Sequence, residues 1–423
     1  MLSQISDETE SHSSDSMSDE DSLKALRDFC MMHEPERKYV NSCGGSKHFL
    51  PCKTSDWKLT HANLLHVFYK SDYLSNPTDV LQTMQMLHEL DVKQKQYVSS
   101  LQNFLKFDSN LDEFCHSPAL VKEKLDRLIA KRESLNDFQA CNEVSVSTLK
   151  GDRFITALYR LHDKIQKQRR ARYRLNESMF TQLILTLGEI CYLEGERCSS
   201  GDESIWSNLR GCKRVTSNPD CRFYKQGRLM YDNCAPVKPT TVVTIHEGHI
   251  NQIIMMKIID QQHGENAKKF EGLEHPEKKR KRKRFKRSQS STEESESCSS
   301  SGISSWSSGQ LLDKSNKPLP EIIADLNVQV LGQHAGELLL DLHEYGLDDH
   351  KSKLTTPGLI IDGTKVYFTL LEMSKSHYEK LCKNVELNET DRAIIYYSRP
   401  LDILHLDSRN TLIENFVLLN NIY

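Results

Sequence analysis

Asp220 and Lys238 have side chains whose types and spacing suit chemistry on a phosphodiester. Asp220 follows Pro219 and begins an apolar segment, while Lys238 ends the segment 234–238, and the chain between them is long enough for a two-strand hairpin. A carboxylate can hold a divalent metal that polarises a phosphodiester and activates water. An ammonium group can stabilise the charge that then develops. A hairpin would place this carboxylate and this ammonium group on two neighbouring strands.

This arrangement resembles the core of the PD-(D/E)XK, or restriction-endonuclease-like, superfamily. In that family an Asp opens one strand, a Glu-X-Lys motif lies on the next, and one helix precedes the pair and another follows it. The segments 220–262 and 366–423 also resemble uncharacterised proteins of Mucor- and Rhizopus-type fungi, whose hairpins end in Gly-Glu-Val-Lys-Pro where this chain has Ala-Pro-Val-Lys-Pro. The resemblance implies a restriction-endonuclease-like mixed sheet flanked by helices, with Asp220 and Lys238 as the catalytic positions.

Pro236 occupies the position at which the resemblance requires an acid. A proline side chain offers no oxygen ligand, so we expect a degenerate, noncatalytic domain without a cofactor. Catalysis with Mg²⁺ would require a relocated acid, and Asp232, on the same face of the strand, or Glu247, near the start of the next predicted helix, are the possible substitutes. Glu177 and Glu189 on the preceding helix are further candidates, and each of these acids is otherwise an ordinary solvated carboxylate.

A basic stretch closes the predicted helix 152–174 and has two interpretations. Cations beside Tyr173 suit contact with nucleic-acid phosphates, DNA or RNA, whereas the same pattern also fits a solvated helix face. The candidate nucleic-acid-binding residues are Lys164, Lys167, Arg169, Arg170, Arg172 and Arg174.

A second basic stretch lies at 278–287, inside a segment rich in Ser, Lys, Arg and Glu. Like charges at this density repel one another and keep the chain extended and solvated. Such a run fits the acidic grooves of a nuclear import receptor, and it also suits nonspecific contact with nucleic acid. The import residues are Lys278, Lys279, Arg280, Lys281, Arg282, Lys283, Arg284, Lys286 and Arg287.

Composition sets the domain organisation. The chain has 423 residues, 37% of them hydrophobic and 27% charged, and a formal net charge of −3 that conceals strongly segregated charge. We expect a disordered acidic tail at 1–22, a helical region at 23–145, and an α/β (α+β) nuclease-like domain at 146–423 interrupted by a disordered basic and Ser-rich insert at 264–318. An acidic N-terminus without a long apolar run predicts neither a signal peptide nor contact with a membrane.

Periodicity and turn signals predict the elements of the α/β domain and of the region before it. Helices are expected from Asn76-Pro77 and Ser117-Pro118 onward, and at 152–174, 176–193, 241–262, 374–384 and 411–419. Strands are expected at 221–225, 228–231, 327–331, 337–342, 359–361, 366–371 and 393–397, with an Asp362-Gly363 turn in one hairpin.

Three functions remain open from the sequence. The first is a nuclear, nucleic-acid-associated protein with a degenerate nuclease-like domain, and the second is an active Mg²⁺-dependent nuclease with a relocated acid. The third is a helical interaction or adaptor protein that does not bind nucleic acid. Pro236 argues against the second, and the basic insert argues against the third.

The run 278–287 is expected to direct nuclear import because its charge density suits an import receptor. Replacing it with Ser and Gly in a fluorescent fusion should abolish nuclear accumulation, as measured by imaging. Unchanged accumulation would contradict the assignment.

Overall fold

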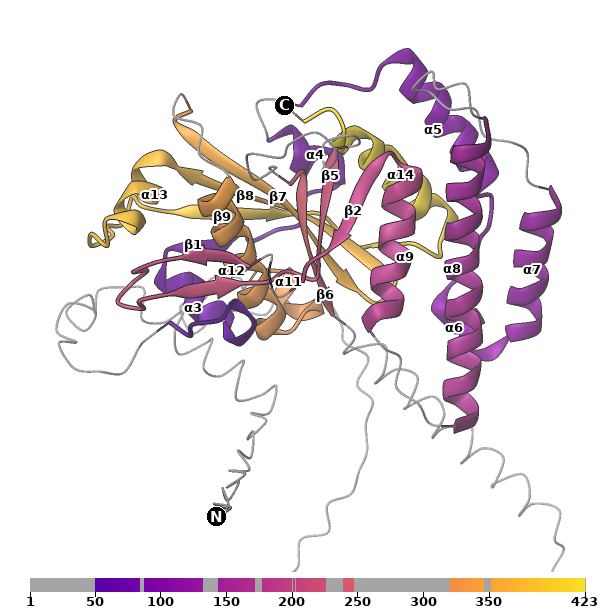
Figure 1. Ribbon diagram of the computed structural model, residues 1–423, viewed down its shortest axis with the longest axis horizontal. Coiled ribbons are helices and arrows are strands. Elements are labelled where there is room, and N and C mark those ends of the chain that lie inside the picture. Colours follow the sequence, from indigo (N-terminus) through magenta and orange to yellow (C-terminus); the bar gives the residue numbers. More distant parts are fainter. Residues whose placement is uncertain are drawn as a thin grey trace, which may run out of the picture.

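The computed structural model describes residues 50–83, 87–131, 144–171, 177–199, 201, 203–225, 239–246, 320–345 and 351–422. These residues form an α+β fold in which helices flank a mixed sheet (Figure 1), as the sequence predicts. The predicted tail at 1–22 and insert at 264–318 lie outside the described residues.

The central sheet has eight strands, seven of them in the order β1-β9-β8-β7-β6-β5-β2, with β10 also pairing with β8. Neighbours are antiparallel except for two parallel pairs, β1 with β9 and β6 with β7. Its first strand comes from the predicted helical region, so the sheet joins segments far apart in the sequence. The strands are β1 (Val67–Tyr69), β2 (Leu193–Arg197), β5 (Cys221–Lys225), β6 (Thr241–His246), β7 (Lys353–Asp362), β8 (Lys365–Ser374), β9 (Ala393–Tyr397) and β10 (Leu401–Asp402).

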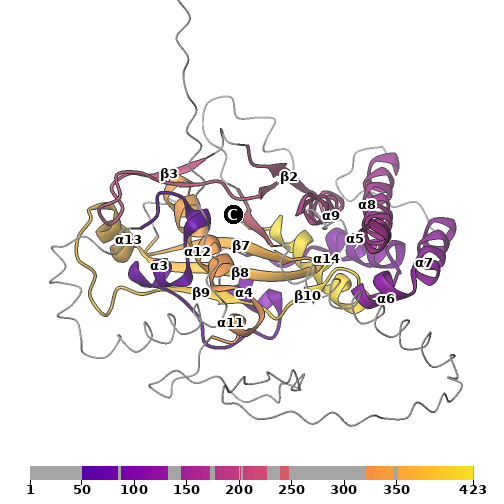
Figure 2. The ribbon, with the colours of Figure 1, turned by 90° about the horizontal axis from the view of Figure 1, so that it is seen from below.

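Helix α12 (Val328–Tyr345) covers one face of the sheet and contacts β6, β7 and β8. Helix α3 (Leu59–Leu64), the 3-10 turn η1 (Thr54–Asp56) and the small hairpin of β3 (Ser204–Trp206) with β4 (Val215–Ser217) pack against α12 on the same side (Figure 2). Val242 and Ile360 point into this core. Two short helices complete this half of the molecule, α11 (Ile322–Asp325) and α13 (Lys375–Cys382).

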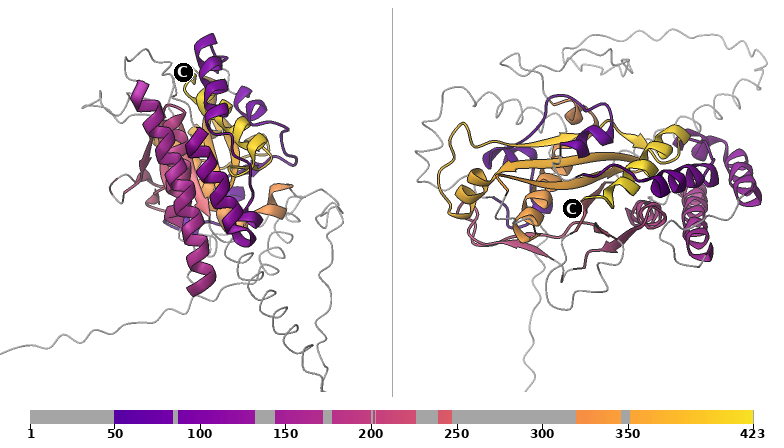
Figure 3. Two further views of the ribbon diagram at one scale, coloured as in Figure 1. Left: turned by 90° about the vertical axis from the view of Figure 1, so that its right-hand side faces the viewer. Right: turned by 90° about the horizontal axis from the view of Figure 1, so that it is seen from above.

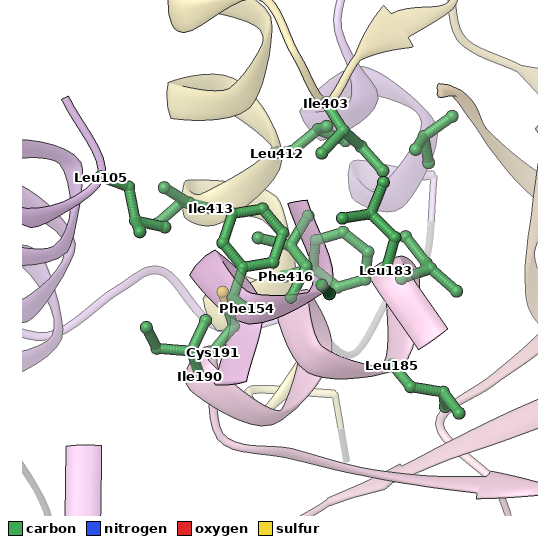
Figure 4. Close-up of a cluster of buried hydrophobic side chains, with 14 of the residues drawn as sticks. Leu105, Phe154, Leu183, Leu185, Ile190, Cys191, Ile403, Leu412, Ile413 and Phe416 are labelled. Atoms are coloured by element: carbon green, nitrogen blue, oxygen red, sulfur yellow. The ribbon is translucent and has the colours of Figure 1, made fainter. Parts of the chain in front are cut away.

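The opposite face of the sheet carries the larger core, because side chains alternate along each strand and Val243 and Leu359 point the other way. Helices α8 and α9 pack side by side at one end of the molecule, with α7 on α8 (Figure 3). Phe154 of α8 lies close to Leu183, Ile190 and Phe416 in this core (Figure 4). The helices of this side are α4 (Pro77–Gln82), α5 (Val92–Phe104), α6 (Leu111–His116), α7 (Pro118–Lys131), α8 (Val144–Ala171), α9 (Glu177–Ile190) and α14 (Leu406–Leu419).

Several predicted elements are confirmed. The strands at 359–361 and 366–371 lie in the β7–β8 hairpin, whose turn contains Gly363 at a φ of 63°. Helices begin at Pro77 and Pro118 as expected, and α9, α13, β9 and α14 overlap their predicted ranges.

Two predictions are wrong. The helix predicted at 241–262 is a strand, β6, over its described part, because Thr241–Ile245 is a run of β-branched residues that packs between β5 and β7. The strands predicted at 327–331 and 337–342 both belong to helix α12. Val328 and Val330 suggested a strand, whereas the polar residues Gln333, Glu337 and Asp341 recur every fourth position, which is helical spacing.

Every helix in the part of the chain that the structure describes is too short or too polar to span a bilayer.

Gly332 allows α12 to lie directly against the chain that leads into α3. A Cβ atom at this position would lie 2.2 Å from the backbone carbonyl carbon of Lys58. An alanine inside an uncrowded helix stabilises it, but here it would separate two packed backbones. Gly332→Ala should therefore lower the free energy of unfolding by about 1–3 kcal/mol in a urea titration.

Gly201→Ala is the matched control, since the nearest atom to its Cβ would be the Ser199 Oγ at 3.7 Å. Equal stability of the Gly332→Ala protein and the Gly201→Ala protein would contradict the close approach of the two backbones.

Candidate functional site

Asp220 stands immediately before β5 and caps the neighbouring strand. Its Oδ2 accepts a hydrogen bond of 2.6 Å from the backbone N–H of Ile245. Cys221 pairs with Val243, so one further step of this antiparallel register places Thr244 opposite Asp220. The strand beside Asp220 therefore presents a hydroxyl at the opposing position.

The sequence predicted a different segment beside Asp220. Strand β6 approaches it with Thr244 and Ile245, which come after Lys238 in the chain. Lys238 lies outside the described residues, as do Pro236 and the two possible substitutes Asp232 and Glu247. The roles predicted for these four residues stay predictions.

Two glutamates approach Asp220 from the helices on either side of the sheet. Glu177 opens α9 and shares a hydrogen bond with the Asp220 carboxyl, and Glu337 comes from α12. Burial, the charge of Glu337 and the bond to Glu177 raise the pKa of Asp220 to about 9, and the Ile245 N–H offsets only part of this rise. The Asp220 carboxyl therefore carries a proton at neutral pH, and its O–H donates the hydrogen bond to Glu177.

Glu337 is fully buried, with both carboxylate oxygens hydrogen-bonded. Thr244 Oγ1 donates to Oε2, and Gln333 Nε2 donates to Oε1 at 2.8 Å. Burial raises the pKa of Glu337, and these two donors oppose the rise. The sequence prediction missed Glu337 because it assigned this segment to a strand, although its spacing from Gln333 and Asp341 gave the helical signal.

Thr244 also connects Glu337 to a buried histidine. His334 Nδ1 lies 2.6 Å from Thr244 Oγ1, and Nε2 lies 2.7 Å from Thr369 Oγ1. Burial lowers the pKa of His334 to about 3, so the ring is neutral. Because Thr244 donates to Glu337, its oxygen accepts the Nδ1 hydrogen of His334, and Nε2 accepts from Thr369. The four side chains thus form a directed chain of hydrogen bonds that ends on the Glu337 carboxylate.

Arg222 and Asp341 form a buried ion pair beside these groups. The guanidinium donates from Nε and Nη2 to the two Asp341 oxygens, both at 2.8 Å, and Ser204 adds a hydrogen bond to each partner. Bidentate pairing of this kind fixes the relative orientation of the two elements that carry it, β5 and α12.

At the end of β6 another acid, Asp362, pairs with a histidine. His246 Nδ1 lies 3.4 Å from Asp362 Oδ1, and the two residues are opposite each other in the parallel β6–β7 register. Thr244, Ile245 and His246 therefore follow one another on the strand beside Asp220, whereas the resemblance implies Glu-X-Lys at 236–238, outside the described residues.

The described residues around Asp220 do not fit a Mg²⁺ site. This ion needs several oxygen ligands in near-octahedral geometry. The Asp220 carboxyl is protonated and bonded to Glu177, while the oxygens of Glu337 are held by Thr244 and Gln333. Over the described ranges, no group of three or more His, Cys, Asp or Glu side chains is arranged to hold a metal ion. The described side chains instead satisfy one another through hydrogen bonds.

The predicted basic helix is α8, and two of its candidate residues are described with their side chains. Lys164 and Lys167 are exposed, on the same face as Arg153 and Arg160. The structure does not describe the side chains of Arg169 and Arg170. Arg172 and Arg174 lie outside the described residues. The import run 278–287 does so as well.

Glu189, the remaining candidate acid on α9, contacts this basic face instead of Asp220. Its carboxylate lies 3.6 Å from Arg153 Nη1, so it forms an interhelical ion pair near the surface.

The sequence matches no protein-family model and no curated protein.

The shared proton makes stability depend on pH. The folded chain keeps a proton on Asp220 that the unfolded chain releases near pH 4, so the free energy of unfolding falls as the pH rises from 5 to 8. Asp220→Asn keeps a donor for Glu177 and an acceptor for the Ile245 N–H but cannot ionise. As the pH rises, the free energy of unfolding of the wild-type protein should therefore fall relative to that of this variant, by up to about 1.4 kcal/mol per pH unit.

Urea titrations of both proteins at pH 5, 6.5 and 8 measure this difference. Glu414→Gln, which removes an exposed carboxylate of α14, is the control for the loss of one acid. A difference between the wild-type protein and Asp220→Asn that stays constant with pH would contradict the shared proton.

Proposed function

We propose that this protein associates with nucleic acid in the nucleus and that its nuclease-like core is degenerate and noncatalytic. The observation that carries the noncatalytic part of this proposal is the register that sets Thr244, a residue without a carboxylate, opposite Asp220. The partners that the proposed function implies are a nuclear import receptor and DNA or RNA.

The order of elements supports a nuclease-like core. Helix α9 precedes β2, β5 and β6, helix α12 follows, and β7 then lies parallel to β6. The resemblance implies the same sequence of parts, with a helix before and after the strand that an Asp opens. Asp220 opens β5 in that order.

The hydrogen bonds around Asp220 support the loss of catalysis. A carboxylate that binds a metal has to be deprotonated. Here a proton shared with Glu177 satisfies Asp220, and Thr244 and Gln333 satisfy Glu337. The acids are thus held by internal donors that would have to be displaced before they could bind a cation.

The exposed face of α8 supports contact with phosphates. Arg153, Arg160, Lys164 and Lys167 lie along one side of this helix, and the sequence continues with the further cations of the 169–174 stretch. Lysine and arginine side chains that neutralise phosphates release counterions, so binding of this kind weakens as salt increases.

An active nuclease is the second candidate, and the position of Glu337 favours it. This residue is an acid on the helix that follows β6, and its charge acts directly on Asp220. It would be the relocated acid in place of Asp232 or Glu247, and Mg²⁺ would have to displace the hydrogen-bond partners that Asp220 and Glu337 now have.

The purified full-length protein should bind labelled DNA and RNA oligonucleotides, with an affinity that falls steeply between about 50 and 200 mM salt. Lys164→Gln combined with Lys167→Gln should weaken binding to all sequences alike. The same double variant should reduce the slope of log K against log salt by about one for each phosphate that is no longer neutralised. Fluorescence anisotropy measures both quantities.

Lys375→Gln combined with Lys383→Gln, on and just after α13 at the other end of the molecule, is the charge-matched control (Figure 1). Absence of binding at low salt, or equal effects of the two double variants, would contradict the α8 surface.

The same preparation, incubated with plasmid DNA and Mg²⁺ or Mn²⁺, separates the two candidates. The first proposal expects intact plasmid. Cleavage by the wild-type protein that disappears in both Asp220→Asn and Glu337→Gln would contradict it and establish the second.

A further inference from the structure

A cleft of about 450 Å³ lies where β1 and β9 meet helices α3 and α11, away from the Asp220 site. This volume falls within the range of about 300 to 1,000 Å³ that is usual for small-molecule sites. Its walls come from the two strands, and its remaining sides come from Leu59, Asn63, Pro320 and Ile323.

Aromatic and cationic side chains alternate on the sheet surface of the cleft. In the parallel β1–β9 pair Phe68 lies opposite Ile394, and Lys70 and Tyr396 follow two residues further on each strand. The Lys70 ammonium lies 5.6 Å from the centre of the Tyr396 ring, and the Arg392 guanidinium lies 5.0 Å from that of Phe68. Both rings are half-buried, so part of each faces solvent.

Asn63 supplies a polar group at the side of the cleft. The residue is only 6% exposed, and it lines the cleft. A side-chain amide at this position offers both a donor and an acceptor to a ligand. The edge of a nucleobase presents complementary groups.

Two cations, Lys70 and Arg392, lie over the rings of the cleft. The acids next to it have their own partners: Glu372 pairs with Lys353 at 3.0 Å, and Asp325, Asp72 and Glu321 accept hydrogen bonds from the Tyr73 hydroxyl, Ser71 Oγ and the Tyr73 N–H. Within the described part of the chain, no carboxylate forms an ion pair with Lys70 or Arg392. Both cations remain able to contact a phosphate.

We infer that this cleft binds single-stranded nucleic acid, with a base against the Phe68 and Tyr396 rings and the backbone phosphates on Lys70 and Arg392. Stacking on an aromatic ring requires an unpaired base, and neighbouring cations suit the phosphates that accompany it. The inference rests on the proposed function and adds a second contact surface, with a preference for single strands that the basic face of α8 does not provide.

The test is anisotropy of the full-length protein with a fluorescent 12-nucleotide single strand and with a duplex of the same length. Phe68→Leu and Tyr396→Leu keep apolar side chains on the strands but remove a ring, and each should weaken single-strand binding by about 5- to 150-fold. Duplex binding should change little. Tyr396→Phe keeps the ring and should bind as the wild-type protein does.

Arg392→Gln should weaken single-strand binding and lower its salt slope by about one. Arg127→Gln, which removes an exposed cation of α7 at the opposite end of the molecule (Figure 1), is the control and should have no effect. Thermal unfolding of each variant shows that the fold is retained.

The outcomes separate this inference from the proposed function. If the wild-type protein binds and the leucine variants bind equally well, the cleft is excluded while the proposed function stands. Displacement of the strand by a free mononucleotide at equal concentration would instead assign the cleft to a small ligand and overturn the inference. If the wild-type protein binds neither oligonucleotide, both proposals fail.

Discussion

The buried ion pair of Arg222 and Asp341 determines how helix α12 lies on the sheet, and the geometry of the candidate site depends on it. Arg222 is two residues after Asp220 on the same face of β5, and Asp341 is one helical turn after Glu337. Each partner is almost fully buried. The pair is tolerated because the two hydrogen bonds of the bidentate contact, together with those of Ser204, offset the cost of removing both charges from water. The contact therefore fixes the approach of Glu337 to Asp220.

This arrangement places more acids than cations in a small volume. Arg222 balances Asp341, and the remaining acids depend on other means of neutralisation. Asp220 retains a proton, and Glu337 accepts hydrogen bonds from Thr244 and Gln333. Hydroxyl and amide donors lower the energy of a buried carboxylate without bringing a charge of their own. The cluster is thus a self-contained polar core whose acids are satisfied by internal partners.

Local signals in the sequence predicted much of the fold. The Asp362-Gly363 turn, the prolines that open α4 and α7, and the alternation in β9 each depend on neighbouring residues, so they were recognisable without tertiary information. Thr241–Ile245 and α12 were misassigned although each carries a local signal, a β-branched run in the first and polar residues at helical spacing in the second. Asp220 could be selected from the sequence, whereas the approach of Thr244 and Glu337 to it became visible only once strand register and helix packing were known.

The parallel pairing of β1 with β9 joins residues 67–69 to residues 393–397, near the two ends of the described chain. Contacts between such distant segments form slowly, because the intervening chain must first be ordered. During synthesis β1 leaves the ribosome long before its partner exists, and the edge of the sheet that carries Phe68 and Lys70 can be completed only after β9 has emerged. The sheet is consequently completed late, and its central strands need protection from aggregation until the segment that contains β9 and α14 arrives.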